Sequence, residues 1–349
     1  MSASALSPRV GSPRPPSEVV ELARHLVAGD GGDPRLVAQE PLKRSVHRLC
    51  FEVGSQPAWV VVKRLPPRQA RVNQLVAQRW LPAAGLEWAC PGVRGILHDS
   101  GGRAVWHVYD DLGGNGLDCH VCDPGQVAPV VELLVELHVR FAGHALLAEC
   151  REHGEELGMT FFTRGVGRCV RLLKSVGSAG APLSREQAEL RDRLLGRVER
   201  LYGERHERAL LLQTSGGPDT LLHGDLWTTN TLVVERTAGV EARLIDWDHA
   251  GVGPVTYDLS TFLYRFPPEH RPSILGEYRD AAARRGWWLP ADPTLNLLFE
   301  TAEYARYACC LAEAALAAAR GEPWGFEDLA EIDTWFDRLK PVLAGTEAE

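Results

Sequence analysis

Hydrophobic and polar positions along the chain follow two patterns, and the change between them falls close to residue 112. Before it, apolar residues alternate with polar ones or form short runs, which is typical of β-strands. Segments with this pattern are 46–53, 57–65, 95–98 and 104–109. Helical spacing occurs at Ser17–Ala28 and at Gln69–Trp80, and we expect the second helix to end near Pro82 and Gly85. The first part of the chain therefore predicts a small sheet lobe with one inserted helix.

After the glycine-rich stretch Leu112–Gly116, apolar residues recur about every 3.6 residues, the spacing of amphipathic helices. Segments with this spacing are 127–141, 161–173, 184–208, 271–285, 295–320 and 326–339. One clear β element, a hairpin, lies among them within residues 221–248. We therefore expect an α+β fold with a small antiparallel sheet lobe over residues 17–111, a larger mainly helical lobe over residues 112–349, and a cleft between the lobes.

Composition and charge narrow the class of protein. The 349 residues are 45% apolar and 24% charged, as in soluble globular proteins of one large or two modest domains. The formal charge of −8 disfavours nucleic acid as a partner. No apolar run approaches the roughly 20 residues of a membrane span. Residues 1–16 are rich in Ser and Pro and predict a disordered tail. We expect a cytoplasmic protein without a membrane partner, whose oligomeric state stays open.

The eight cysteines do not indicate a metal or redox site. Cys119–Cys122 is the one C-x-x-C motif, and no second pair stands at the spacing of a zinc site. The adjacent Cys309 and Cys310 fall in a helical pattern, where small apolar side chains pack well. We expect ordinary reduced thiols.

The hairpin region carries the candidate chemistry. Asp225 and Asn230 lie in a loop before an apolar strand, and Asp246 follows the returning strand. A hairpin brings these three side chains together, where they can hold a hard cation and orient a hydroxyl beside a triphosphate. Asp225 would orient the hydroxyl or accept its proton, and Asn230 would bind the metal ion. The alternative is a loop in which Asp and Asn only cap turns. The arrangement as a whole predicts a kinase of small molecules.

Three further residues are candidates for supporting roles. Lys63 ends the apolar run Trp59–Lys63, where a point cation can reach the α- and β-phosphates of a nucleotide. The alternative is a lysine that keeps a sheet edge soluble. We expect His223, beneath the loop, to fix the loop backbone by a hydrogen bond and not to act as a base. Asp258 is expected to cap a helix or to anchor the catalytic loop.

Together these residues resemble the aminoglycoside phosphotransferase and choline kinase family, which shares the protein kinase-like fold. The matching motifs lie in order between residues 35 and 265, at 62–63, 108–114, 137–138, 223–230, 245–248, 253–254 and 257–259. The resemblance implies that ATP or GTP binds between the lobes, with its base against the backbone of Tyr109 to Asp111. It makes Asp225 the catalytic base and assigns Mg²⁺ to Asn230 and Asp246. The first lobe would then bind the nucleotide, and the second would carry the catalytic loop and the substrate site.

The chain departs from the family's pattern at two places. The family usually has a glutamate, in the first helix after the strand lysine, that pairs with this lysine. Here Gln69–Trp80 contains no acid, and Gln74 occupies the expected position. The turn that would cover the phosphates, Pro41–His47, contains no glycine, so we expect Ser45 and nearby backbone N–H groups to cover them. Asp248 would be an accessory metal ligand or, as we expect, a cap.

The substrate is expected to bind on the helical lobe. Trp227 can stack on a sugar or a quaternary ammonium group. Glu300 and Glu303, on successive turns of one helix, can attract amines, although helix carboxylates are more often solvated. We expect an O-phosphotransferase that acts on a hydroxyl of an aminoglycoside-like or other cationic antibiotic, as in antibiotic resistance. The alternatives are a metabolic kinase of the choline, homoserine or fructosamine type and a catalytically silent nucleotide-binding protein.

Overall fold

The computed structural model describes residues 14–29, 32–178, 182–237 and 239–343. Most of the expected tail, residues 1–16, lies outside the described residues. The chain folds into two compact units. Unit 1 takes its residues from 1–140, 148–154 and 223–250, and unit 2 takes its residues from 141–147, 155–222 and 251–349. This division does not coincide with the predicted lobes at 17–111 and 112–349, because unit 1 also takes residues from beyond 111. The bounds of the lobes stay a prediction.

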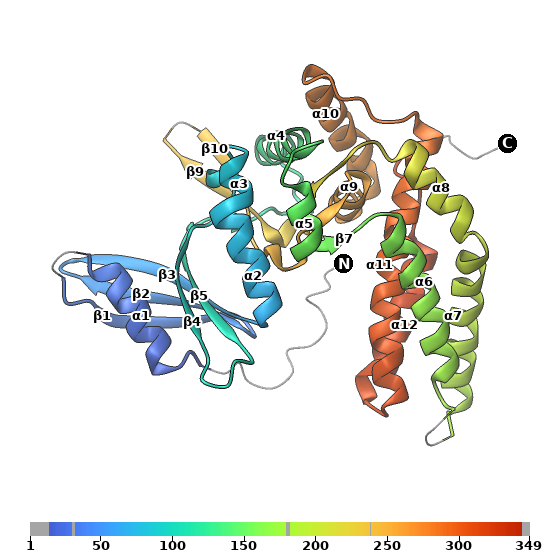
Figure 1. The fold of residues 1–349 in the computed structure, drawn as a ribbon, viewed down its shortest axis with the longest axis horizontal. Coiled ribbons are helices and arrows are strands. Elements are labelled where there is room, and N and C mark those ends of the chain that lie inside the picture. Colours follow the sequence, from blue (N-terminus) through green and yellow to red (C-terminus); the bar gives the residue numbers. More distant parts are fainter. Residues whose placement is uncertain (1–13, 30–31, 179–181, 238, 344–349) are drawn as a thin grey trace. The chain divides into compact units, whose positions relative to one another are not determined.

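Unit 1 contains a five-stranded antiparallel sheet with the strand order β1-β2-β3-β5-β4 (Figure 1). Its strands are β1 (Arg35–Lys43), β2 (Val46–Val53), β3 (Gln56–Leu65), β4 (Val93–His98) and β5 (Val105–Asp110). Side chains alternate between the two faces of a strand. One face therefore carries Val60 and Val62, which pack in a common core with Val19 of the helix α1 (Ser17–Ala28). The opposite face carries Val61 and Lys63.

The rest of unit 1 is helical, apart from a second small sheet. A helical segment follows β3 as α2 (Pro67–Leu75), the π turn η2 (Val76–Trp80) and α3 (Leu81–Ala83). It ends at Ala83, between Pro82 and Gly85, as expected. Further elements are η3 (Glu87–Ala89), α4 (Pro124–Phe141) and α5 (Leu147–His153). The second sheet has the order β10-β9-β6 and consists of β6 (Asn115–Gly116), β9 (Thr231–Arg236) and β10 (Gly239–Leu244). The antiparallel pair β9–β10 is the expected hairpin.

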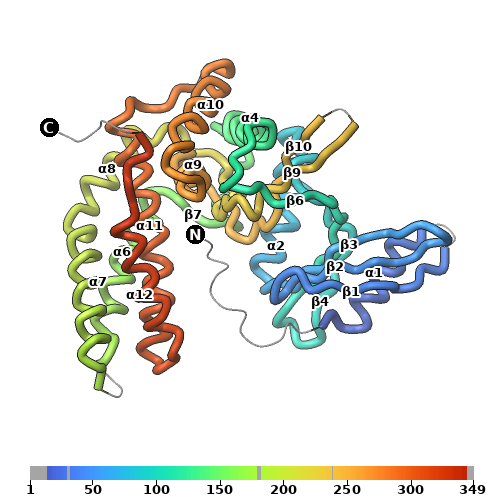
Figure 2. The backbone as a smooth tube through the Cα atoms, turned by 180° about the vertical axis from the view of Figure 1, so that it is seen from behind, coloured from blue at the N-terminus to red at the C-terminus, as the bar shows by residue number. Residues whose placement is uncertain are grey.

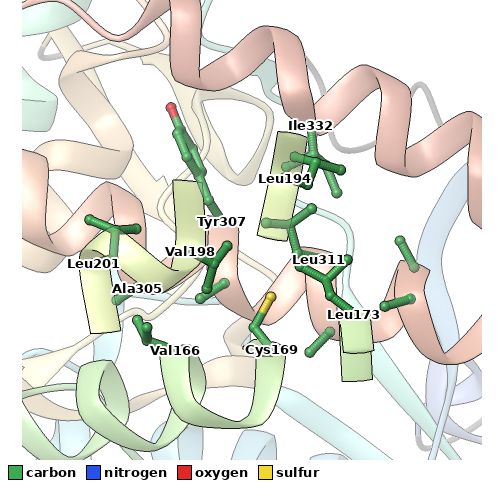
Figure 3. Close-up of a cluster of buried hydrophobic side chains, with 14 of the residues drawn as sticks. Val166, Cys169, Leu173, Leu194, Val198, Leu201, Ala305, Tyr307, Leu311 and Ile332 are labelled. Atoms are coloured by element: carbon green, nitrogen blue, oxygen red, sulfur yellow. The ribbon is translucent and has the colours of Figure 1, made fainter. Parts of the chain in front are cut away.

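Unit 2 is mainly helical. Its helices are α6 (Met159–Ser175), α7 (Arg185–Gly203), α8 (Arg205–Ser215), α9 (Thr256–Leu263), η6 (Pro268–His270), α10 (Arg271–Arg284), α11 (Asp292–Ala319) and α12 (Pro323–Arg338). Figures 1 and 2 show α6, α7, α11 and α12 side by side. Val166, Val198, Leu311 and Ile332 of these helices point into one buried cluster (Figure 3). A small sheet of β7 (Glu155–Glu156), β11 (Gly251–Pro254) and β8 (Asp219–Leu222) completes the unit.

The observed elements confirm the predicted α+β class, and two details differ from the prediction. The segment 184–208 is not one helix, because α7 ends at Gly203 and α8 starts at Arg205. Strand β1 was not predicted, because most of its side chains are exposed and it shows no apolar alternation. None of the described helices has the length and apolar character needed to cross a membrane.

Candidate active site

One face of the five-stranded sheet lines a pocket of about 310 Å³ in unit 1. This volume is within the range of small-molecule binding sites, roughly 300–1,000 Å³. Charge in the lining comes from Lys43, Arg48, Lys63, Asp110, Asp111 and Asp246, and the backbone segment 109–115 borders the pocket. Most of the other lining side chains are apolar, and they include Leu42, Val46, Val61, Ala77, Cys90, Pro91, Leu112, Leu232, Ile245 and Trp247. The pocket therefore combines an apolar wall with a small group of charges.

Lys63 is a buried cation with two carboxylate partners. The run of apolar residues in β3 places it on the pocket face, and its side chain is only 11% exposed. The ammonium donates hydrogen bonds to Asp246 and, at 2.5 Å, to Oδ1 of Asp248. Burial alone would lower the pKa of Lys63, but the attraction of the two carboxylates outweighs burial and raises this pKa. Lys63 therefore stays charged at neutral pH.

The turn after β10 brings both carboxylates to this lysine. Asp246 has a left-handed backbone with φ of 70°, which Asp tolerates better than most residues. Trp247, between the two acids, is buried and donates its indole N–H to the Leu244 carbonyl at 3.1 Å. Lys43 donates to Oδ2 of Asp246 at 3.3 Å. Burial would raise the pKa of Asp246, but the nearby ammonium groups hold it well below its usual value.

The loop before β9 is fixed to this turn through His223, which is fully buried. Its Nε2 lies 2.9 Å from the Ile245 carbonyl, and its Nδ1 accepts the Asp225 N–H at 3.3 Å. The two contacts are compatible with the tautomer whose Nε2 donates to the carbonyl. Gly224 has φ of 80°, and a Cβ there would lie 1.9 Å from the His249 carbonyl oxygen. Only glycine therefore allows the loop to lie this close to the turn.

Asn230 and Asp225 meet in the same loop. The Asn230 amide nitrogen donates to the backbone carbonyl of Asp225 at 2.9 Å and to its Oδ2 at 3.2 Å. The other end of the amide, Oδ1, is buried and has no hydrogen-bond partner among the described residues. A buried acceptor without a partner costs free energy, which a bound cation would offset.

The donor set fits a cation that keeps much of its water. Among the described residues no group of three or more His, Cys, Asp or Glu could hold a metal ion. One carboxylate, from Asp246, and one amide oxygen, from Asn230, are few ligands for a structural metal. They suit Mg²⁺, which often takes one or two protein ligands and completes its shell with water and substrate phosphates.

Of the other residues predicted for nucleotide binding, two line the pocket and one does not. Tyr109 and Asp111 line it, and Asp111 binds Arg48 with Oδ2 2.6 Å from the guanidinium. Ser45 lies in the turn between β1 and β2, and its carbonyl accepts the Arg64 N–H at 2.8 Å. Ser45 is not among the lining residues, although its neighbours Lys43 and Val46 are.

The residues predicted for the substrate are mostly engaged in structure. Trp227 is 8% exposed. Glu303 is fully buried and pairs with Arg306 and, at 3.8 Å, with Arg265. Glu300 pairs with Arg208 at 2.7 Å. The expectation that Glu303 attracts amines is therefore corrected, because its buried carboxylate is already neutralised by arginine cations of unit 2. For the partly exposed Glu300, which Arg208 neutralises, it stays a prediction.

The two predicted caps are also corrected. Asp258 is fully buried in the first turn of α9, whose N-cap residue is Val255 and has no side-chain cap. Asp258 lies three residues after the N-cap position, so it is not the cap. Its role in anchoring the loop stays a prediction. The carboxylate of Asp248 binds the ammonium of Lys63 and the amide of Asn73 at 2.8 Å, so Asp248 is part of the site.

Asn73 is the residue that sequence reasoning missed. Its amide nitrogen donates to Asp248, and also to the Gln69 carbonyl at 2.9 Å. Gln74, which stands where we expected the partner of Lys63, donates instead to Gln78 at 3.0 Å. A signal was present, since Asn73 is three residues after the buried Ala70 and so falls on the buried side of α2. A polar residue at such a position needs a partner.

A model of the phosphotransferase enzyme family matches residues 51–293 of the chain. The match covers more than half of the chain, so the protein belongs to this family. Membership confirms the resemblance drawn from the motifs and the predicted class of enzyme, a phosphotransferase. No curated protein matches the chain.

Solved structures share the fold. Spectinomycin phosphotransferase APH(9)-Ia, in complex with ADP and spectinomycin, is 14% identical, with a TM-score of 0.57 over 94% of this chain and 100% of that one. Choline kinase LicA from Streptococcus pneumoniae is 12% identical, with a TM-score of 0.53 over 93% and 100%. Macrolide 2'-phosphotransferase MphH from Brachybacterium faecium is 19% identical, with a TM-score of 0.51 over 90% and 97%. The likeness confirms the predicted kinase-like fold, and at these identities it concerns the fold alone.

Proposed function

We propose that the protein is an ATP-dependent O-phosphotransferase, which transfers the γ-phosphoryl group of ATP to a hydroxyl of a small molecule. One observation carries the proposal. The ammonium of Lys63 and the carboxylate of Asp246, 183 residues apart in the chain, meet in the lining of an apolar pocket. A cation and an acid in such a pocket suit a ligand that is apolar at one end and polyanionic at the other, as a nucleotide is.

The nucleotide would bind in unit 1. The apolar lining, including Val46 and Ile245, would hold the base beside the backbone of Tyr109 to Asp111. Lys63 would bind the α- and β-phosphates. ATP is favoured over GTP because a protein of this fold is known with ADP bound.

Asn230 and Asp246 would hold Mg²⁺, which, when bound, neutralises the phosphate charge. The unpartnered Oδ1 of Asn230 supports this assignment. Its amide nitrogen at the same time holds the carboxylate of Asp225, so one side chain positions both the metal ion and the base. His223 keeps the loop against the turn that carries Asp246.

Asp225 would align the attacking hydroxyl. The hydroxyl oxygen forms a bond to the γ-phosphorus while the bond from this phosphorus to the β–γ bridging oxygen breaks, and ADP leaves with that oxygen. The proton of the hydroxyl passes to the carboxylate of Asp225. The half-exposed position of Asp225, beside the fixed amide of Asn230, supports this role.

The substrate is best sought first among hydroxylated antibiotics, including aminoglycoside-like and other cationic ones. The similar solved structures include a spectinomycin and a macrolide phosphotransferase. They also include choline and ethanolamine kinases, so a metabolic alcohol is the second candidate. The ion pairs of Glu300 and Glu303 leave the choice between a cationic and a neutral substrate to other residues.

The proposal is tested with a panel of antibiotics and metabolic alcohols, using ADP release and the mass of the product as readouts. We expect one class to gain a phosphoryl group. Asp225→Ala should lower turnover by about 10³-fold or more while nucleotide affinity stays near that of the wild type. Full turnover in this variant would refute the role of Asp225. Nucleotide binding without transfer to any compound would instead favour a silent nucleotide-binding protein.

A further inference from the structure

Lys63 has two carboxylate partners, Asp246 and Asp248. The proposed function also assigns the metal ion to Asp246. Asp246 binds both Lys63 and Lys43. If Asp246 is to bind a metal ion together with the nucleotide, it has to give up part of this pairing. A buried ammonium that loses its only partner is costly, because desolvation is no longer offset. The lysine therefore needs a second acid that stays with it.

Asp248 has the position and the contacts for this task. Its Oδ1 accepts a hydrogen bond from the Lys63 ammonium at 2.5 Å and another from the Asn73 amide at 2.8 Å. Its side chain is 17% exposed, so little water competes for the carboxylate. Asn73 belongs to α2, and it lines the same pocket as Lys63. Helix α2, which contains no acid, thus contacts Lys63 indirectly, through the amide of Asn73 and the carboxylate of Asp248.

Asn73 is itself held in place. Its amide nitrogen donates to the Gln69 carbonyl one turn earlier at 2.9 Å. Its Oδ1 lies 3.5 Å from the hydroxyl of Tyr109, and this hydroxyl is 2.9 Å from Nδ1 of His107. Asn73 is 5% exposed and His107 is 1% exposed. The amide is therefore oriented from both ends before any ligand arrives.

We propose that Asp248, oriented from α2 by Asn73, is the permanent carboxylate partner of Lys63, and that it frees Asp246 for the metal ion of the nucleotide complex. Both are positioning residues, since they act through Lys63. The proposal rests on the proposed function, because it assigns the metal ion to Asp246. It also explains how the chain does without an acid in Gln69–Trp80.

The proposal predicts that metal binding and nucleotide binding respond differently in Asp248→Asn. Lys63 then has Asp246 as its one carboxylate, so the metal ion has to compete with the ammonium. We expect the affinity for Mn²⁺, measured by electron paramagnetic resonance with a non-hydrolysable ATP analogue, to fall about tenfold. Affinity for ADP without a divalent cation, measured by calorimetry, should not fall, because a negative charge near the phosphates is removed. A merely structural role of Asp248 would weaken both.

Two variants and a matched control sharpen the test. Asn73→Ala should lower the affinity for Mn²⁺ by about threefold, because Asp248 keeps its charge but loses one of two donors. Exchange of the two side chains, in Asn73→Asp with Asp248→Asn, returns a carboxylate to the lysine and should recover most of the loss. Gln74→Ala, next to Asn73 on α2, should change neither affinity. Melting temperatures without ligands show whether each variant folds.

The outcomes separate this inference from the proposed function. Unchanged affinity for Mn²⁺ in Asp248→Asn, or parallel losses for Mn²⁺ and ADP, overturns the inference and leaves the phosphotransferase in place. Failure of the exchanged pair to recover metal affinity, while it melts like the wild type, also overturns it. A wild-type protein that binds neither nucleotide nor Mn²⁺ overturns the proposed function itself.

Discussion

Two clusters of charged side chains, one in each unit, look alike in composition and differ in design. In unit 1 one ammonium, from Lys63, binds two carboxylates, from Asp246 and Asp248. In unit 2 one carboxylate, from Glu303, lies between two guanidinium groups, from Arg265 and Arg306. The first cluster lines a pocket, and the carboxylate of the second is fully buried.

This difference distinguishes a ligand site from a structural ion pair. A lysine carries a compact charge on a flexible stem and can change partners, whereas the planar guanidinium of arginine holds its partners in a fixed geometry. The cluster of unit 1 can therefore exchange a carboxylate for a phosphate. The cluster of unit 2 has no such freedom, since Arg306 also donates to Thr261, which in turn donates to the Tyr257 carbonyl at 2.9 Å. We infer that the first cluster serves function and the second serves stability.

Within the two clusters, the largest expected effect is that of Asp246→Asn on turnover. Asparagine tolerates the left-handed backbone of this position, so the turn should persist. Loss of the charge that would hold the metal ion should lower kcat/KM by about 10³-fold, which is about 4 kcal/mol of the barrier. Steady-state kinetics with the substrate found in the panel measure this effect. Stability should fall little, because Lys63 keeps Asp248.

The matched control for this change is Glu52→Gln, which removes an exposed ion pair of β2 with Arg35. It should alter neither kinetics nor stability. If Asp246→Asn instead kept its turnover and lost stability, the cluster of unit 1 would be structural, and the contrast between the two clusters would disappear.

Second in size is the effect of Glu303→Gln on stability. The change leaves the buried Arg306 without its carboxylate, and breaking such a pair costs about 3 kcal/mol or more of the free energy of unfolding. Urea denaturation measures the loss. At a temperature where the variant is folded, kcat and KM should equal those of the wild type. The control is Glu313→Gln, on the same helix as Glu303, which removes an exposed ion pair with Arg168 of α6. It should cost less than about 1 kcal/mol.

The sequence could predict the parts of the fold and of the site that depend on local patterns. The spacing of Asp225, Asn230 and Asp246 around a hairpin was readable, because turns and strand periods are local. The observed strands β2 and β3 agree with the apolar patterns at 46–53 and 57–65. Local patterns therefore predicted the elements that carry the site.

Long-range contacts were not readable in this way. Glu303 shares a helical pattern with solvated acids, and its full burial depends on Arg265 and Arg306 of other turns and segments. Asn73 and Asp248 are 175 residues apart, and no local pattern pairs them. Strand β1 pairs with β2 through backbone hydrogen bonds, and most of its side chains are exposed. Its sequence therefore has no alternation of apolar and polar residues from which the strand could be predicted.

Third comes a pH effect that is specific to unit 1. Burial, with help from the charge of Lys63 and from His98, lowers the pKa of His107 from 6.5 to about 4. Between these values the unfolded chain binds a proton that the folded protein does not, so stability falls as the pH drops through this window. The loss is about 3 kcal/mol at most, and about 2 kcal/mol near pH 5.

Urea denaturation of the wild type and of His107→Gln at pH 7.5 and pH 5 measures this effect. The slope of stability with pH should be smaller in the variant. The depressed pKa of Asp246 acts elsewhere, because its contribution is lost only as the pH falls below the usual value of an aspartate, near 4. Equal slopes in both proteins would show that His107 takes up its proton in the folded state, and that its hydrogen bond with Tyr109 does not keep it neutral.

The smallest expected effect belongs to Glu300→Gln. The carboxylate is 36% exposed, and Arg208 would keep its second partner, Glu204, at 2.7 Å. Stability should therefore change by less than about 1 kcal/mol. KM should also stay the same for cationic and for uncharged substrates, because Arg208 already neutralises this carboxylate. A rise in KM for cationic substrates alone would show that Glu300 leaves Arg208 to bind an amine. An ion pair of unit 2 would then serve substrate binding, and the distinction between the two clusters would not hold for this unit.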